Sequence, residues 1–191
     1  MIKATNKKSE DFAPIDEGSY PARIHQIIHI GTISGYQGQL QNKVRIGFEF
    51  PTEKLVFKEE NGEQPRILSQ EYTLSFNEKA NLRGLIDACD PEALKVDGDG
   101  FLEEFNVEEL IGKECLVTIS HKAKKDGSGI IATISNCTRM PKGMVCEPAI
   151  NKPQILSYDN WNEELFNSYP GFLKDKIKTS VEYKAMVENP F

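Results

Sequence analysis

The chain has 191 residues, of which 39% are hydrophobic and 27% charged, enough for one sizeable core or a core with a small appendage. It has no apolar run near the ~20 residues of a membrane-spanning helix and no hydrophobic secretory signal at its N-terminus. Four widely spaced cysteines without a C-x-x-C pair favour free thiols. We therefore expect a cytoplasmic protein with no membrane partner, and the net charge of −6 argues at first against nucleic acid.

The charges are unevenly distributed along the chain. Residues 51–111 carry 6 Lys or Arg and 15 Asp or Glu, whereas residues 112–145 carry 6 and 2. Two further cations, Lys43 and Arg45, lie within a largely apolar segment. Because local charge decides where a phosphate backbone can bind, an acidic protein with basic segments can still hold nucleic acid.

The first expected elements are two strands that follow a polar arm. Residues 1–17 show no periodicity, which predicts a flexible N-terminal arm. The segments 20–30 and 43–50 are β-rich and are joined by a polar, glycine-rich loop at 31–40. In the first segment, one face is expected to hold Ala22, Ile24, Ile28 and Ile30. In the second, apolar residues alternate with Lys43 and Arg45, so these cations lie opposite the apolar face.

A third strand and a helix come next. Residues 67–76 alternate as a strand with a polar outer face. Asn77 then fits a helix N-cap, and Asp90-Pro91 fits the helix end. Apolar side chains between them recur at helical spacing, which predicts one helix after the third strand. Residues 105–111 predict a short helical turn.

The last third of the chain predicts a hairpin and a helical tail. The segments 114–121 and 130–139 alternate as strands, and their connection contains Lys122, Lys124 and Lys125. From residue 141, prolines mark a linker that leads into short amphipathic helices. The tail contains Trp161, Phe166 and Phe172, which need an apolar surface to pack against, so we expect residues 141–191 to be docked rather than independent.

The order of these elements indicates a fold class. Three strands, a helix and two further strands form a mainly β pattern, with the helix between strands three and four. This is the element order of the OB-fold, a five-stranded Greek-key β-barrel, expected here over residues 18–140. In that fold, ligands lie across strands two and three, between the loops at 31–40 and 121–129 of this chain.

This geometry selects candidate residues for binding single-stranded DNA. Phosphates would meet Lys43, Arg45, Lys122, Lys124 and Lys125, with Arg139 and Lys142 as outlying cations. Bases would stack on Tyr36 and, less favourably placed, Tyr72. Two alternatives remain open: the lysines of the hairpin loop are ordinary solubilising charge, and Tyr36 only anchors its loop. Phe48 and Phe50 are assigned to the core.

The sequence also resembles a known family. The runs KVRIGFEFP, EYTLSFNEKANLR, LIGKECLVTISH and MPKGM, followed by a tail with W…F…P…KIKTS-x-EY, are similar to phage-encoded single-stranded DNA-binding proteins. The resemblance covers roughly residues 12–185. It implies an OB-fold that coats and protects single-stranded DNA during phage replication or recombination. It transfers no individual contact residue.

The remaining observations concern alternative functions and binding partners. Scattered carboxylates without a two-metal arrangement argue against a nuclease, so we expect no enzyme activity, metal or cofactor. The ending with Pro190 and Phe191 is similar to the tip by which bacterial single-stranded DNA-binding proteins engage partner enzymes, but Lys184 dilutes the acidic run, so the match is either accidental or a docking tip for replication or recombination proteins. A structural or adaptor protein without affinity for nucleic acid is the main alternative. Exposed edge strands leave an oligomer open.

Overall fold

A computed structural model describes residues 12–75, 77–94 and 104–188. The chain order of its elements is β1 (Gly18–Ser34), η1 (Tyr36–Gly38), β2 (Leu40–Val56), η2 (Glu59–Asn61), β3 (Glu63–Thr73), α1 (Asn81–Cys89), η3 (Val107–Leu110), β4 (Glu114–Ala123), β5 (Ile130–Thr138), β6 (Gln154–Leu156), α2 (Glu163–Ser168), α3 (Gly171–Lys178) and α4 (Val181–Glu188). The mainly β class, the five longer strands and the helix between the third and fourth of them are confirmed.

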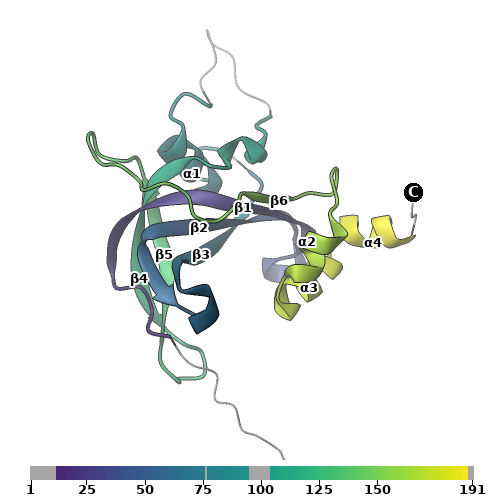
Figure 1. Cartoon of the computed structure of the whole chain (residues 1–191). Coiled ribbons are helices and arrows are strands. Elements are labelled where there is room, and N and C mark those ends of the chain that lie inside the picture. Colours follow the sequence, from purple (N-terminus) through teal and green to yellow (C-terminus); the bar gives the residue numbers. More distant parts are fainter. Residues whose placement is uncertain (1–11, 76, 95–103, 189–191) are drawn as a thin grey trace, which may run out of the picture.

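The strands form one curved sheet in the order β3-β2-β1-β4-β5 (Figure 1). All neighbours along this path are antiparallel. β1 is long enough to pair with β4 along its first third and with β2 along the remainder. The two edge strands, β3 and β5, approach each other to within 8 Å between Cα atoms, and α1 packs against both. The sheet therefore curves toward closure, with α1 beside the seam.

The main hydrophobic core lies inside this curve. The alternation in β2 places Val44, Ile46, Phe48 and Phe50 there, and Phe48 and Phe50 are fully buried. The apolar face of α1 covers the core with Leu82, Leu85 and Ile86. The predicted core face of β2 is thus confirmed, as is the apolar stripe of the helix.

Two irregularities in β1 change the predicted face of that strand. Its pairing with β2 shifts register between Ile24 and Gln26 and again between His29 and Gly31. An extra residue reverses the alternation of side chains after it. Ile24 therefore faces the main core, whereas Ile28 and Ile30 face a second cluster on the opposite side, so their predicted shared face is wrong.

The C-terminal helices build this second cluster against β1. Ile28, Ile30 and Ile33 pack with Leu156, Phe166, Tyr169, Leu173 and Ile177. The Trp161 ring lies 4.9 Å from Phe166 and stacks at 5.5 Å on Tyr158. β6 pairs in parallel with residues 26–28 of β1 and leads into these helices. The tail is thus docked on the sheet, beside the end of β1 and the start of β2 (Figure 1).

Local hydrogen bonds explain where the helices begin. The Asn162 side chain accepts a hydrogen bond of 2.8 Å from the Leu165 amide and caps α2. Asn77, the predicted cap of α1, instead accepts from the Lys79 amide in the turn before the helix, which begins at Asn81. None of the helices within the described ranges is long and apolar enough to cross a membrane.

Candidate nucleic-acid interface

The outer face of β2 and β3 carries a group of charged side chains next to α3. Arg45 lies opposite Glu71 in the β2–β3 register, and its Nη1 is 3.8 Å from the Glu71 Oε1. The other carboxylate oxygen of Glu71 accepts a hydrogen bond of 2.6 Å from the Lys176 Nζ of α3. Lys43 lies two residues before Arg45 on the same side of β2. One carboxylate thus lies among three cations.

An exposed aromatic ring completes this group. The Arg45 Cζ lies 5.8 Å from the centre of the Phe172 ring. Phe172 is nevertheless 63% exposed, so much of its ring is open to solvent. We define the Arg45 face as Lys43, Arg45, Glu71, Phe172 and Lys176.

The electrostatics of the Arg45 face suit an anionic ligand. Burial lowers the pKa of the Arg45 guanidinium, whereas the Glu71 charge raises it. Within the Arg45 face three cations accompany one carboxylate, although the chain as a whole is acidic. Such a group can contact phosphates while the exposed ring offers a surface for a base.

Hydrogen bonds from the tail fix the position of α3 and α4 beside this face. The Glu182 carboxylate accepts bonds of 2.6 Å from the Thr32 amide and from the Thr32 hydroxyl. Partial burial raises the pKa of Glu182, but these bonds outweigh it and leave the pKa lowered. The Tyr158 hydroxyl donates to the Ile30 carbonyl oxygen at 3.0 Å. The tail therefore holds Phe172 in a defined place over β2.

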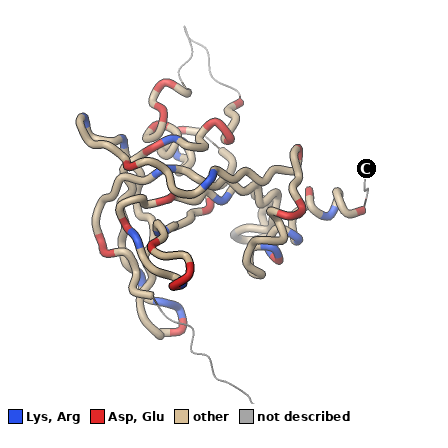
Figure 2. The backbone as a smooth tube through the Cα atoms, in the orientation of Figure 1, with Lys and Arg blue, Asp and Glu red and all other residues tan. Residues whose placement is uncertain are grey.

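The lysines of the β4–β5 hairpin lie far from the Arg45 face. Arg45 pairs with Ile28 near the end of β1, whereas β4 runs past Gly18, the first residue of β1, before it reaches Lys122. Figure 2 shows these cations at the tip of the hairpin, away from the tail helices. Lys122 and Lys125 are exposed, and Lys124 is half-buried. The hairpin lysines therefore do not belong to the Arg45 face.

Arg139 and Lys142 form a third location. The Arg139 Nε donates a hydrogen bond of 3.1 Å to the Asp87 carbonyl oxygen at the end of α1, and Lys142 is exposed. Both follow β5, which β1 and β4 separate from β2 in the strand order. They do not belong to the Arg45 face.

Of the two tyrosines predicted to stack on bases, one is buried and the side chain of the other is not described. Tyr72 is only 4% exposed and packs in the main core, so it has no free ring face for a base. Its position in β3 follows the same alternation that buries Leu68, which is why it points inward. Tyr36 lies in η1, but its side chain is outside the described part, as are Pro190 and Phe191.

The structure adds Phe172 and Lys176 to the site. Leu173 and Ile177 form the buried stripe of α3, four residues apart. Phe172 precedes this stripe by one residue, so the helical period turns it away from the second cluster. The expectation that Phe172 needs burial is wrong, although the helical spacing contains the signal that corrects it.

Comparisons with known proteins add no further identification. No protein-family model matches the chain, and no curated protein is significantly similar to it. Within the described residues, no group of three or more His, Cys, Asp or Glu side chains is arranged to hold a metal ion.

Proposed function

We propose that this protein binds single-stranded DNA without catalysis, through an OB-fold whose strands two and three carry the Arg45 face. The strand order β3-β2-β1-β4-β5 supports the fold, as does the helix between β3 and β4. The approach of β3 to β5 is also expected of a Greek-key barrel. Ligands of such barrels lie across strands two and three, where the Arg45 face is found.

One observation carries the proposal. Phe172 presents an exposed ring directly beside Arg45 and close to a second cation, Lys176. A positively charged surface with an aromatic ring matches what sequence-independent binding of single strands requires, because phosphates and base faces recur at every nucleotide. Double-stranded DNA keeps its bases stacked on each other, so the ring would have no base face to contact.

The biological role follows from the resemblance of the sequence to phage-encoded proteins. The protein would coat and protect single-stranded DNA in the host cytoplasm during phage replication or recombination. The hairpin lysines Lys122, Lys124 and Lys125 would contact a longer strand outside the Arg45 face. If the ending with Pro190 and Phe191 is a docking tip rather than an accidental match, its partner would be a replication or recombination protein.

The test is fluorescence anisotropy of a labelled oligothymidine, titrated with the protein at several salt concentrations. We expect binding that weakens with salt, with a much weaker signal for a duplex of the same length. Absence of single-strand binding at low salt would refute the proposal and favour the structural or adaptor role. Magnesium-dependent degradation of the oligonucleotide would refute the non-catalytic part.

A further inference from the structure

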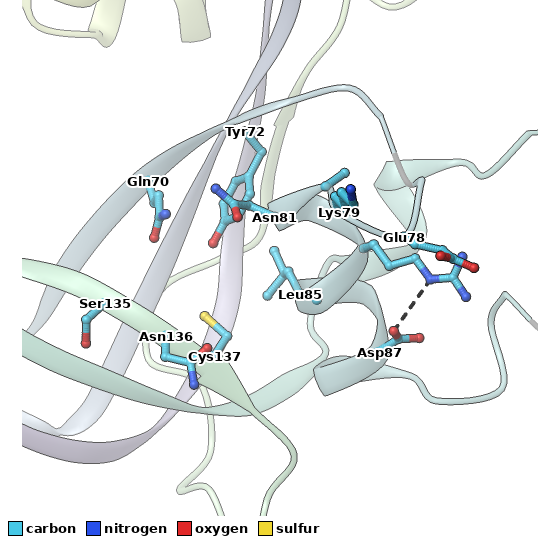
Figure 3. Close-up of a pocket in the computed structure, with 13 residues that line it drawn as sticks. Gln70, Tyr72, Glu78, Lys79, Asn81, Leu85, Asp87, Ser135, Asn136 and Cys137 are labelled. Carbon is cyan, nitrogen blue, oxygen red and sulfur yellow. Dashed lines mark ion pairs between the residues drawn. The ribbon is translucent and has the colours of Figure 1, made fainter.

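A polar pocket lies on the seam of the sheet, away from the Arg45 face. It has a volume of about 380 Å³ and is bounded by β3, by the start of α1 and by β5 (Figure 3). Gln70 and Tyr72 come from β3, Asn81 and Leu85 from α1, and Asn136 from β5. Three segments that are distant in sequence thus meet around one space.

The size of the seam limits what can enter it. An additional strand between β3 and β5 would need two strand spacings, about 9.6 Å. Where the Cα atoms of β3 and β5 approach to within 8 Å, the seam is too narrow for a further peptide strand. The volume instead falls within the range of small-molecule sites.

The polar groups of the pocket are available for a ligand. The carboxamides of Gln70, Asn81 and Asn136 make no hydrogen bond to any other residue in the described ranges. Each carboxamide presents a donor beside an acceptor, the arrangement with which Asn and Gln read the edge of a nucleobase in two simultaneous hydrogen bonds. Leu85 and Tyr72 line the floor of the pocket but are only 1% and 4% exposed, so recognition of a base would rest on the carboxamides rather than on stacking.

The charged side chains of the pocket indicate where a phosphate would bind. Lys79 is exposed, comes from the turn before α1 and lines the same pocket as Asn81 (Figure 3). The Arg83 Nε lies 3.6 Å from the Asp87 carboxylate, so part of the remaining charge is already paired. Glu78 is the other acid of the lining and disfavours a ligand with several negative charges. A single phosphate near Lys79 fits this balance.

We propose that this pocket binds one nucleotide, with the base among the three carboxamides and the phosphate near Lys79. The site is independent of the Arg45 face. The nucleotide comes from one of two sources, a free nucleoside monophosphate or one residue of a bound single strand. The recognised chemistry is the same in both cases.

The experiment is isothermal titration of the full chain with each of the four deoxynucleoside monophosphates and with the matching nucleosides. We expect binding in the millimolar range or tighter. The double variant Asn81→Ala with Asn136→Ala should weaken it about tenfold, since each lost hydrogen bond costs roughly 1 kcal/mol. Lys79→Ala should weaken nucleotides but leave nucleosides unchanged. Asn160→Ala, an exposed asparagine outside the pocket, is the matched control.

The outcomes separate the pocket from the proposed function. Absence of binding by all eight ligands, or binding that the double variant leaves unchanged, overturns the pocket, whatever the oligothymidine does. If the double variant also weakens oligothymidine and mononucleotide competes with it, the pocket is a subsite for the strand. If mononucleotide binds without competing, the pocket takes a free nucleotide. Both of these results support the site.

Discussion

Truncation of Phe172 separates binding from folding more cleanly than any other change on the Arg45 face. The ring is 63% exposed and belongs to neither hydrophobic cluster. Phe172→Ala should therefore change the free energy of unfolding by no more than about 1.5 kcal/mol, the sum expected for a surface substitution and for an exposed contact with Arg45.

The same change should reduce affinity for single-stranded DNA strongly. Stacking of one base on an aromatic ring contributes about 1–3 kcal/mol, so its loss should increase the dissociation constant roughly 5- to 150-fold. The salt dependence should remain as it was, because no cation is lost. Phe172→Tyr should keep most of the affinity.

Oligothymidine anisotropy and thermal melting of the same preparations measure these two effects. Phe57→Ala is a matched control, because Phe57 is 40% exposed and contacts Phe12 rather than the Arg45 face. If Phe172→Ala weakens binding no more than Phe57→Ala does, the ring has no role in stacking. A large fall in melting temperature would refute the claim that Phe172 is dispensable for folding.

The remaining predictions concern charge, the core and pH. Glu71→Gln removes the carboxylate that pairs with Arg45 and Lys176, so single-strand affinity should rise several-fold in the anisotropy assay, and a fall would contradict the assigned charges. Lys124→Ala with Lys125→Ala should make the slope of log affinity against log salt concentration shallower by about 1.4 for long oligothymidine and should leave the binding of short oligonucleotides unchanged. An equal loss of affinity for long and short oligonucleotides would place the hairpin tip at the Arg45 face. Phe48→Ala should cost about 3–5 kcal/mol in urea unfolding because the ring is fully buried, and a cost below 1 kcal/mol would be inconsistent with that burial. Burial lowers the pKa of His25, and the Glu49 charge only partly opposes this shift. As the pH falls below about 6.5, the unfolded chain therefore binds a proton at this histidine before the folded chain does, and the free energy of unfolding decreases. His25→Gln should flatten the loss between about pH 7.5 and 5.5 in urea unfolding, and an unchanged slope would assign it to other groups.

The sheet was predictable because its strands alternate clearly. In β2, four apolar residues at a spacing of two determine the buried face, and the structure confirms that Phe48 and Phe50 lie there. The helix between β3 and β4 was equally visible from its apolar spacing. Such local periodicity depends only on neighbouring residues, so the sequence contains it directly.

The parts that were not predictable depend on contacts between distant segments. The register shifts in β1 reverse the faces of Ile28 and Ile30, and alternation alone carries no sign of them. β6 is three residues long and exists because it pairs with β1. The docking of α3 places Phe172 over Arg45, although the two residues are 127 positions apart in the chain. The cations of β2 and those of the β4–β5 hairpin were both predicted from the sequence. Their separation became evident only from the pairing of β1 with β2 and with β4.

The most direct test of the central claim is photochemical cross-linking of a 5-iodouracil oligonucleotide to the protein, followed by mass spectrometry of the cross-linked peptides. We expect a cross-link in the peptide that contains Phe172, which is lost in Phe172→Ala and is reduced by excess oligothymidine but not by duplex. Cross-links confined to other peptides, with none near Phe172, would contradict the assignment of the Arg45 face as the place where single-stranded DNA binds.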